Sequence, residues 1–494
     1  MGQLADTLTD AGHNVTILVP LVDVKMRNKT GVTSTKDVLF IDLDDIARQN
    51  IVLNRNGSFW TGTYEAELYS KYYSFFQYNL VEVCASIFRQ PQILDELKTR
   101  NFDVVLNEPL SICGFGLAYR LGIRKMILTT SCTLYENLNV YLGEPDDSSY
   151  VPSVLAETDD QMNLLERYEN FKRTYYMRKS IEGSFDAEEK QYTENYQVDM
   201  PPWRELLAST SVHFTNANAF VDFPRPTIQK TVFIGGVSVH MEHIRSQKID
   251  NEWEEVLGLR NRTMLISFGS VILSKSMPIP YRETLLRVIE SLPDVTFIWK
   301  YESDDTKWAE HVTNVYFSKW VPQTALLNDK RVTAFFTHGG LGSINELAYS
   351  GKPALMVPVF WDQPRNAKMY ARLGAAITIK KEELNNFDLV RRLIHAILYD
   401  ESYTHHARRI AEMLENQPVK PKDLVVKYTE FVARFGPFPN MDPYVRHLNF
   451  IQRIGLDVLT IWYSGSIVLF LLIGLVLKLV FSSGIVSLGK KKID

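Results

Sequence analysis

The chain has 494 residues, which is enough for two or three domains that each bury a core. Hydrophobic residues make up 45% and charged residues 23%, which is typical of globular proteins and excludes a largely disordered chain. With 54 basic and 58 acidic side chains the net charge is -4, so the composition lacks the basic surplus expected for nucleic-acid binding.

The N-terminal residues predict a helix followed by a buried strand. Leu4 and Leu8 lie four positions apart, which suits one face of a helix, and Gly12 is a suitable stop. Residues 15–21 are apolar and predict the strand. In a doubly wound sheet the strand that should precede such a helix is central. The sequence therefore predicts a hole in the sheet where that strand is missing.

The rest of the first half repeats the alternation of strand and helix. We expect a strand over residues 104–106, a helix over 114–121 and a strand over 125–130. Residues 211–236 hold a strand, a turn with two prolines and a second strand that ends at two glycines. A domain boundary is expected directly after this segment.

From residue 263 onward the same pattern continues. Apolar strands are predicted over 264–268, 295–299, 332–337 and 354–359, with helices over 281–291 and 343–349. Repeated βα units indicate a parallel sheet flanked by helices, so the fold class is α/β. Two such halves are expected to face each other across a cleft, where ligands usually bind.

The cysteines leave the redox state open. Three residues, Cys84, Cys113 and Cys132, cannot form a complete disulfide framework, and no CxxC pair indicates zinc. One disulfide and three buried thiols are both compatible with the sequence.

Four glycosylation sequons fit a lumenal protein, although such sequons also recur by chance. We expect the first of them to enter a buried strand and discount it for that reason. The sequons begin at Asn14, Asn28, Asn56 and Asn261.

Residues 458–477 contain no charged side chain and predict a transmembrane helix. Twenty residues at about 1.5 Å each cover the roughly 30 Å hydrocarbon core of a bilayer. Trp462 and Tyr463 lie near one boundary, as interfacial aromatic residues do. A buried core helix is the alternative interpretation.

Lysines after the span predict its orientation. By the positive-inside rule, Lys478 and residues 490–492 place the tail in the cytoplasm and the large N-terminal part in the lumen. Residues 491–494 also have the form of a dilysine endoplasmic reticulum retrieval signal, which is compatible with a simple basic stop. A lumenal domain needs a signal peptide, and none is present. We therefore expect Met1 to be an internal methionine of a longer natural protein.

The most specific segment runs from residue 320 to 363 and reads WVPQTALLNDKRVTAFFTHGGLGSINELAYSGKPALMVPVFWDQ. Within it, FFTHGGLGS has the form of a strand, a glycine-rich turn and a helix start, which points free N–H groups and the helix dipole at an anion. The glycines let a diphosphate approach the backbone, and the histidine and serine can add hydrogen bonds. Such turns also serve plain packing. The residues concerned are His338, Gly339, Gly340, Gly342 and Ser343.

This segment resembles the signature of the UDP-glycosyltransferase family, to which the UDP-glucuronosyltransferases belong. Weaker resemblance covers nearly the whole chain, including AGHNVT, FDVVLNEP, VPSVLAETDDQM and the membrane tail. The chain is identified as an invertebrate-like, N-terminally truncated member. The resemblance implies a GT-B fold, with two facing Rossmann-like domains, here joined to a C-terminal transmembrane helix. It also implies a glycoprotein that acts in detoxification.

The resemblance further implies a donor site in the second half. Trp320 would stack on uracil, and Gln323 would bind the nucleoside. Glu346 would hold the ribose hydroxyls, because a carboxylate can accept from both. Asp362 and Gln363 would bind hydroxyls of the donor sugar. The phosphates would be reached by Ser270, which follows the first strand of this half.

Other roles for these residues stay open at the level of single positions. Taken alone, Trp320 suits a core position and Asp362 suits a helix cap. Many family members carry Asn in the glycine-rich turn where this chain has Gly342. A backbone contact would then replace that side chain.

The acceptor hydroxyl must lose a proton as it attacks the anomeric carbon, and the resemblance implies a histidine base oriented by a carboxylate. That histidine precedes the Met-Gly-x-Leu-Ala-Asp stretch and is absent from this sequence. His13 belongs to the AGHNVT strand entry and is expected to be a polar loop residue. The carboxylate position falls on Glu108, where many relatives have Asp. Glu108 ends a strand, as functional groups of α/β folds often do, and a surface carboxylate is the alternative.

Two features outside the signature invite other interpretations. Asp42-Leu43-Asp44 has the DxD form of metal-dependent glycosyltransferases, but Asp44 and Asp45 begin a helix-like run. We therefore predict a helix start there and no metal. An aromatic cluster could line an acceptor pocket, although packing suits most of its members. The cluster consists of Tyr64, Tyr69, Tyr72, Tyr73, Phe75, Phe76 and Tyr78.

The sequence thus predicts an inverting, metal-independent transfer of a hexosyl group from a UDP-sugar to a small lipophilic acceptor. Glucuronic acid is the expected sugar and glucose the alternative. The UDP-sugar is a co-substrate, so no cofactor is expected. Two other classes remain open, namely a protein that binds UDP-sugar without turnover, because the base is absent, and a non-enzymatic membrane scaffold.

The predicted organisation follows from these assignments. Membrane lipid is an expected partner, nucleic acid is not, and a homo-oligomer is left open. The full-length protein is expected in the endoplasmic reticulum membrane with one span. The predicted parts are residues 1–235 for the acceptor, 236–430 for the UDP-sugar, 431–457 as a return and juxtamembrane segment, 458–477 as the span and 478–494 as the cytoplasmic tail.

Overall fold

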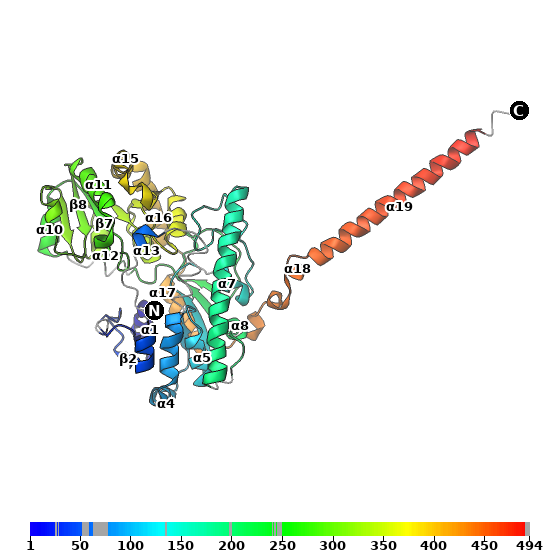
Figure 1. Cartoon of the computed structure of the whole chain (residues 1–494), viewed down its shortest axis with the longest axis horizontal. Helices are drawn as coiled ribbons and strands as arrows, with labels where there is room; N and C mark the ends of the chain where they lie inside the picture. Colours follow the sequence, from blue (N-terminus) through cyan, green and yellow to red (C-terminus); the bar gives the residue numbers. More distant parts are fainter. Residues whose placement is uncertain are drawn as a thin grey trace. The chain divides into compact units, whose positions relative to one another are not determined.

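The computed structural model describes residues 1–24, 27, 29–51, 59–62, 78–133, 136–196, 200–239, 241, 244 and 249–489. The chain divides into two compact units, Met1–Met441 and Asp442–Asp494. Within the described residues, the larger unit holds parallel sheets with helices on their faces, and the smaller unit is helical (Figure 1). The α/β class predicted from the sequence is confirmed.

The first half of the larger unit contains two separate parallel sheets. A two-stranded sheet has the order β1-β2, and a four-stranded sheet has the order β3-β4-β5-β6. The three strands predicted with bounds in this half are found within one residue of them, and the segment 211–236 holds two strands as expected. The strands are β1 (Thr16–Leu21), β2 (Asp37–Asp42), β3 (Val105–Asn107), β4 (Met126–Thr130), β5 (Val212–Thr215) and β6 (Thr231–Phe233).

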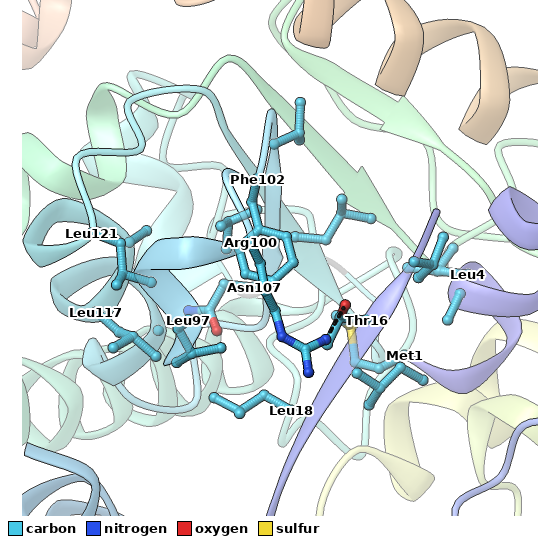
Figure 2. A pocket seen from close by; sticks show the side chains of 18 of the residues that line it. Met1, Leu4, Thr16, Leu18, Leu97, Arg100, Phe102, Asn107, Leu117 and Leu121 are labelled. Atoms are coloured by element: carbon cyan, nitrogen blue, oxygen red, sulfur yellow. Dashed lines mark hydrogen bonds between the residues drawn. The ribbon is translucent and has the colours of Figure 1, made fainter. Parts of the chain in front are cut away.

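The two sheets of the first half are not hydrogen-bonded to each other within the described residues. Among the described residues β1 pairs only with β2, and β3 pairs only with β4. A cavity of about 780 Å³ lies between these two strands, and it is lined by residues from β1, from β3 and from helix α1 (Gly2–Asp10) (Figure 2).

Helices of the first half bury the faces of these sheets. The longest, α7, has 32 residues and begins with a capping box in which the Asn163 side chain accepts from Leu165 N and Glu166 N. Phe185 of α7 packs edge-on against the buried Trp203, with ring centroids 5.1 Å apart. The helices are α2 (Asp45–Asn50), Tyr78–Phe88, α4 (Pro91–Thr99), α5 (Cys113–Arg120), α6 (Glu136–Leu142), α7 (Leu164–Asn195) and α8 (Trp203–Ala208), with the 3-10 turn η2 (Phe59–Thr61).

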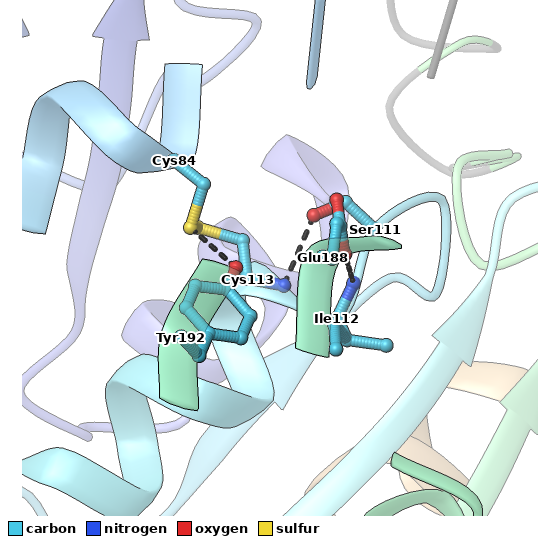
Figure 3. Close-up of a disulfide and its surroundings, with 6 residues drawn as sticks. All are labelled: Cys84, Ser111, Ile112, Cys113, Glu188 and Tyr192. Atoms are coloured by element: carbon cyan, nitrogen blue, oxygen red, sulfur yellow. Dashed lines mark hydrogen bonds between the residues drawn. A yellow bond between two sulfur atoms is a disulfide. The ribbon is translucent and has the colours of Figure 1, made fainter. Parts of the chain in front are cut away.

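A disulfide joins Cys84, on the helix Tyr78–Phe88, to Cys113 at the start of α5 (Figure 3). Of the two alternatives left open by the sequence, one disulfide is therefore correct. Next to it, the Glu188 carboxylate accepts a hydrogen bond of 2.6 Å from Ile112 N, at the N-terminus of α5. Burial raises the pKa of Glu188 to about 7.

The second half contains a six-stranded parallel sheet with the order β12-β11-β10-β7-β8-β9. Successive side chains of each strand enter opposite core clusters. Leu265 and Phe335 lie in one cluster, and Met264 and Phe336 lie in the other. The sheet is thus buried on both faces, which explains its nearly continuous apolar strands. The strands are β7 (Arg262–Ser267), β8 (Val295–Lys300), β9 (Val315–Ser318), β10 (Val332–Thr337), β11 (Ala354–Met356) and β12 (Ala376–Thr378).

The helices of this half alternate with its strands. The predicted helices are found as α11 and α13, each beginning two residues before its expected start. The elements are α10 (Asn251–Gly258), η3 (Ser274–Ser276), α11 (Ile279–Glu290), η4 (Lys307–Ala309), α12 (Gln323–Asn328), α13 (Leu341–Ser350), α14 (Gln363–Ala371), η5 (Lys381–Asn385), α15 (Phe387–Tyr399) and α16 (Glu401–Glu415).

The chain then returns to the first half. Helix α17 (Pro421–Phe435) packs against β4 and β5, with Val425 and Val432 in the same core cluster as Phe214. The predicted division at residue 430 falls inside this helix.

Two passages of the chain between the halves lie side by side. Asn218 Nδ2 donates to Gly235 O at 3.1 Å in the first passage and to Gln417 Oε1 at 3.4 Å in the second. Gln417 Nε2 in turn donates to the Tyr349 hydroxyl at 2.8 Å. A Cβ on Gly236, which has φ +97°, would lie 2.4 Å from the Tyr349 ring, so only glycine fits this crossing.

A buried ion pair also joins the halves. Arg365 NH1 of α14 lies 2.8 Å from Asp222 Oδ1, and the two side chains are 1% and 2% exposed. Arg365 Nε also donates to Pro152 O at 3.0 Å. Desolvated charges of this kind are stable only when paired, so this contact fixes α14 against the first half.

The smaller unit ends in a long apolar helix. Helix α19 (Leu456–Gly489) follows η7 (Tyr444–His447) and α18 (Phe450–Arg453), and its segment Leu456–Ser482 has a mean hydropathy of 2.4. None of its most apolar stretch is buried, so the alternative of a buried core helix is wrong. The helix exceeds the predicted span 458–477 because Lys478 is followed by more apolar residues. Residues 490–494, which carry the predicted retrieval signal, lie outside the described residues.

Candidate active site

The glycine-rich turn connects β10 to α13. Gly339 has φ +84°, which glycine adopts without strain, and Gly340 is the N-cap of α13. No side chain caps this helix start, so its first backbone N–H groups remain available to an anion. A Cβ on Gly342 would meet nothing within 4 Å, which leaves open space directly over the first turn of the helix.

His338 is held between two glycines. A Cβ on Gly269 would lie 2.8 Å from His338 Cε1, and a Cβ on Gly340 would lie 2.6 Å from His338 Nε2. Burial lowers the pKa of His338 from 6.5 to about 4, and the charge of Lys300 adds to the effect. The imidazole is therefore neutral near pH 7 and can donate one hydrogen bond.

Lys300 is a site residue that the sequence analysis missed. It ends β8, and its Nζ donates to Gly269 O at 2.6 Å and contacts Glu302 Oε1 at 3.3 Å. Ser270, exposed, follows Gly269 directly, so the predicted phosphate residue lies beside this cation. A lysine that closes an apolar strand at the carboxyl edge of a parallel sheet was the available signal.

The predicted nucleoside residues are brought together beside the turn. Gln323 Nε2, at the start of α12, donates to Glu346 Oε2 at 2.6 Å and to Ser343 Oγ at 3.2 Å. Thr324 Oγ1 donates to the other oxygen of Glu346 at 3.1 Å. Burial raises the pKa of Glu346, and the hydrogen bonds from Gln323 and Thr324 oppose this rise.

Trp320 lies just before this group and is 72% exposed. The alternative of a core position is therefore wrong. An exposed indole presents a flat apolar surface of the kind on which nucleic acid bases stack.

The turn at the start of α14 approaches the glycine-rich turn. A Cβ on Gly339 would lie 3.3 Å from Gln363 O. Gln363 Oε1 accepts from Val359 N at 2.9 Å and from Phe360 N at 3.0 Å, which fixes the loop. Trp361 has φ +58°, a strained conformation for a bulky residue that persists only where its surroundings impose it.

Asp362 occupies the N-cap position of α14 but makes no capping hydrogen bond, so the alternative of a helix cap is wrong. Its Oδ2 accepts from Asn366 Nδ2 at 2.7 Å. Burial raises the pKa of Asp362, while hydrogen bonds from Asn366 and the Cys132 thiol oppose the rise. Because the Asp362 carboxylate does not cap α14, it remains available to bind a ligand.

Glu108 follows β3, at the carboxyl edge of the first half. Its Oε1 accepts from Ser131 N at 2.8 Å and also from Ser131 Oγ. Ser131 O accepts from Asn216 Nδ2 at 2.9 Å, and Asn216 Oδ1 accepts from Asn345 Nδ2 at 3.2 Å. Asn345 belongs to α13. A chain of hydrogen bonds therefore links the predicted carboxylate to the helix of the glycine-rich turn.

The DxD sequence is a helix start, as predicted. Asp44 is the N-cap of α2, and its Oδ1 accepts from Ala47 N at 2.8 Å. The same oxygen accepts from Arg89 NH2 at 2.9 Å, and the Arg89 hydrogen bond is the main reason why the pKa of Asp44 is lowered. Among the residues that the structure describes, no group of three metal-ligating side chains is found.

The remaining sequence predictions have mixed outcomes. His13 lies between α1 and β1, where its Nε2 is 3.2 Å from Glu430 Oε1 of α17. Asn14 is exposed in the same loop, because β1 begins only at Thr16, so the prediction that it enters a buried strand is wrong. Tyr78 is 51% exposed. The other six aromatic residues of the predicted cluster, and Asn28 and Asn56, lie outside the described residues.

Solved structures with this architecture identify the class. The glycosyltransferase of kitacinnamycin is 18% identical, covers 89% of this chain and 95% of its own, and superposes with a TM-score of 0.58. The glycosyltransferase VinC, solved in complex with dTDP, is 18% identical over 88% of this chain and 96% of its own, with a TM-score of 0.56. The fold is that of the GT-B glycosyltransferases.

Sequence comparison then gives the family. The profile described as "UDP-glucoronosyl and UDP-glucosyl transferase" matches residues 1–492, and the chain belongs to this family. UDP-glucuronosyltransferase 2A2 of Homo sapiens is 27% identical over 468 residues, which cover 92% of this chain and 85% of that protein. UDP-glucuronosyltransferase 1A8 of Rattus norvegicus is 26% identical over 467 residues, covering 93% and 85%. The chain is thus a glycosyltransferase enzyme of this family.

Proposed function

We propose that this protein transfers glucuronic acid from a UDP-sugar to small lipophilic alcohols or phenols, with inversion at the anomeric carbon and without a metal. The observation that carries the proposal is that three features lie close together at the start of α12 and α13. These parts are the uncapped start of α13, the Gln323–Glu346 pair and the exposed Trp320.

The diphosphate is assigned to the glycine-rich turn. Backbone N–H groups at the start of α13 would bind its oxygens, with the neutral imidazole of His338 as a further donor. Lys300 adds positive charge beside Gly269. These groups stabilise the charge that develops on UDP as the bond to the sugar breaks, which is a large part of the catalytic task.

The nucleoside and the sugar are assigned to the two flanking groups. Uracil would stack on Trp320, and the ribose hydroxyls would donate to Glu346, whose two oxygens already point toward Gln323 and Thr324. On the other side of the turn, Asp362 and Gln363 would bind the sugar hydroxyls. The fold holds the side chains of Glu346, Asp362 and Gln363 in place through hydrogen bonds.

The carboxylate Glu108 is assigned the positioning of the general base. Among the described residues its carboxylate contacts Ser131, and no histidine ring is within hydrogen-bond distance of it. Binding of UDP-sugar without turnover is the competing function. Release of UDP from a UDP-sugar in the presence of a phenol decides between the two.

The identity of the donor sugar is a proposal that follows the names of the relatives, which are UDP-glucuronosyltransferases. UDP-glucose is the competing donor. The test uses the full chain in detergent micelles with each donor at equal concentration and one phenolic acceptor. Faster UDP release with UDP-glucuronic acid supports the proposal, and faster release with UDP-glucose contradicts it.

Donor binding itself is tested separately from turnover. UDP should raise the Tm of the full chain, because a ligand that binds only the folded state stabilises it. Trp320→Ala should lower UDP affinity by about tenfold, since stacking on one aromatic side chain contributes about 1–3 kcal/mol. Trp308→Ala is a poor control because Trp308 packs against Trp299. Phe171→Ala changes an exposed aromatic residue on α7, in the first half, and should leave UDP affinity unchanged.

The location is also a proposal. The segment Leu456–Ser482 fits a single membrane span, and we assign the protein to the endoplasmic reticulum membrane with the larger unit in the lumen. Asn261 is exposed just before β7 and would then accept a glycan. Protease protection and glycosidase treatment of microsomes test this orientation, and a larger unit that is digested in intact microsomes would contradict it.

A further inference from the structure

A short segment of the first half is buried in the core of the second half. It consists of residues 59–62, here named the docked segment, and lies in sequence between α2 and the helix Tyr78–Phe88. Its turn η2 is visible in blue among the green and yellow elements of the second half (Figure 1). The Trp60 side chain is 2% exposed and belongs to the same core cluster as Phe268 and Ile272. The first half therefore contributes part of the core on which the donor site is built.

Trp60 contacts both ends of the loop that follows β7. Its Nε1 donates to Leu273 O at 3.1 Å. Its ring packs edge-on against Phe268, with ring centroids 5.0 Å apart and planes at 88°. Between these two contacts lie Gly269 and Ser270, and Ser270 is the residue that we assign to the phosphates. Trp60 thus fixes the loop that carries a phosphate residue.

The docked segment also contacts the loop that leads into α14. The ring centroids of Phe59 and Phe360 are 4.5 Å apart. Lys381 Nζ donates to Phe59 O at 3.0 Å and also to Gly62 O. The same ammonium group donates to Val359 O at 3.3 Å. Because an ammonium group carries three N–H donors, one lysine ties both ends of the docked segment to this loop.

The burial of Lys381 shows that the docked segment is a necessary part of this region. The residue is 1% exposed, and burial lowers its pKa. A buried charge is costly unless hydrogen bonds satisfy it. Two of the three carbonyl acceptors of Lys381 belong to the docked segment, so removing this segment would leave the ammonium group poorly satisfied.

The loop held by Phe59 and Lys381 positions the residues assigned to the donor sugar. Val359 N and Phe360 N both donate to Gln363 Oε1. A shift of Phe360 would therefore displace Gln363 and the adjacent Asp362. The contacts of the docked segment thus reach the phosphate loop and the sugar loop, and none of those described above involves α12 or α13, which carry the residues assigned to the nucleoside.

We propose that Trp60 and Phe59 are positioning residues for the sugar-diphosphate end of the donor, supplied by the first half to the site in the second half. The inference rests on the proposed function, because it uses the donor site assigned there. Trp60 acts through the loop with Ser270, and Phe59 acts through the loop that leads to Gln363. Binding of the diphosphate and the sugar depends on the docked segment, whereas binding of the nucleoside does not.

The test of Trp60 uses the variant Trp60→Phe in the full chain in detergent micelles. Phenylalanine keeps an aromatic ring beside Phe268 but removes the N–H donor to Leu273 O. The affinity for UDP should fall by about fivefold, as expected for the loss of one hydrogen bond. The affinity for uridine, which has no phosphate, should be unchanged. Isothermal titration measures both affinities.

The test of Phe59 uses Phe59→Leu, a half-buried position at which the smaller side chain is expected to leave the fold intact. This variant removes the ring contact with Phe360. The donor is UDP-glucuronic acid or UDP-glucose, whichever the unaltered chain binds more tightly, and no acceptor is added. Its affinity should fall by about threefold, as expected for the loss of one aromatic pair, while the affinity for UDP should be unchanged.

The matched control is Trp203→Phe. Trp203 is fully buried in the first half, and its Nε1 also donates one hydrogen bond, to Asp186 Oδ1 at 2.7 Å. This variant should lower the Tm without changing the ratio of UDP affinity to uridine affinity. The comparison separates a role in positioning from a role in stability alone.

Two results would overturn the proposal. The first is a ratio of UDP affinity to uridine affinity that stays the same in Trp60→Phe, whether or not the Tm falls. The second is a Phe59→Leu variant that binds UDP-sugar as tightly as the unaltered chain or loses UDP affinity equally. Absence of UDP binding by the unaltered chain would instead refute the proposed function, and this inference with it, so the two failures are distinguishable.

Discussion

Lys300 places a positive charge beside the turn that we assign to the diphosphate. Replacing it with methionine should weaken UDP binding by about tenfold, because a charge within several ångströms at a partly buried site contributes about 1–3 kcal/mol. Binding of uridine, which has no phosphate, should be unchanged. Isothermal titration with both ligands measures the two affinities.

The control for this experiment is Lys300→Arg, which keeps the charge and should recover most of the UDP affinity. A parallel loss of uridine and UDP binding in the methionine variant would mean that Lys300 only supports the loop at Gly269. The structure gives a reason for this second outcome, because Lys300 Nζ donates to the carbonyl oxygen of Gly269.

His338 gives stability a defined pH dependence. Its pKa is about 4 in the folded protein and 6.5 for an ordinary histidine, so the unfolded chain binds the extra proton first. The stabilisation is complete above pH 6.5 and is lost as the pH falls toward 4, by about 3 kcal/mol. Urea unfolding of the parent and of His338→Gln, at several values between pH 4 and 7, should show the variant losing less stability over this interval.

His213 must be considered in the same measurement. Burial first, and then the charge of Arg225, lowers its pKa to about 3, so it destabilises the fold over the same acid range. Because His213 is present in both proteins, its effect cancels in the difference between parent and variant. His405→Gln, at an exposed position, should leave the slope unchanged. Identical slopes for the parent and His338→Gln would refute the prediction.

At single positions, residues that the family resemblance assigns to the donor site lie close together in the fold. Gln323 contacts both Ser343 and Glu346 because α12 and α13 bring them together. Lys300 was missed because it is remote in sequence from the signature.

Among single elements, the disulfide between Cys84 and Cys113 ties α5 to the helix Tyr78–Phe88 across 29 residues. A loop of this length predicts a stabilisation of about 3.5 kcal/mol, mainly through the entropy of the unfolded chain. The double variant Cys84→Ala, Cys113→Ala should lose about 2–4 kcal/mol in urea unfolding. Reduction of the parent with dithiothreitol should give a similar loss.

The same reagent provides the internal control. Dithiothreitol should have no effect on the stability of the double variant, because Cys132 is then the remaining cysteine. A further loss on reduction would show that Cys132 takes part in a disulfide between molecules. An unchanged stability in the double variant would contradict the entropic argument.

Element by element, strong apolar runs were predictable and short or polar ones were not. β10 was predicted at its observed bounds, since a run of four apolar residues and two threonines ends at the glycine-rich turn. β9 and β12 have only four and three residues and depend on their neighbours in the sheet. α7 is rich in charged and aromatic residues without an apolar stripe, so its 32 residues carry little helical periodicity to detect.

For the whole molecule, the division after Met441 predicts separable parts. A chain that ends at Met441 lacks the apolar helix Leu456–Ser482 and should remain in the supernatant after ultracentrifugation without detergent. Because the donor residues all lie before this point, its Kd for UDP should stay within about threefold of the full chain, a difference of about 0.7 kcal/mol.

A chain that ends at Gly436 offers the comparison, since it keeps α17 but removes the segment up to η6 (Pro439–Met441). If α17 is the last element that the core needs, this shorter protein should also bind UDP. A chain that ends at Lys420 removes α17 from β4 and β5 and should aggregate or lose its cooperative unfolding. Loss of UDP binding after truncation at Met441 would show that the smaller unit supports the site.

The overall architecture followed from the alternation of strands and helices. A return segment was expected from residue 431, but the sequence did not show that the return begins with α17 (Pro421–Phe435). Its apolar residues Val425 and Val432 fit any partner, and only the packing against Phe214 reveals which sheet it covers. Long-range choices of this kind depend on tertiary contacts that local pattern does not encode.

The side-by-side passages at Gly236 and Gln417 limit how the two halves of the larger unit can rotate against each other. Two halves joined by one connection can rotate about several axes. Two adjacent connections act as a hinge and favour rotation about one axis. The hydrogen bonds from Asn218 Nδ2 to Gly235 and Gln417 hold the two passages together. Entry of a nucleotide sugar and exit of UDP would then use the same hinge rotation, at which Tyr349 contacts both passages.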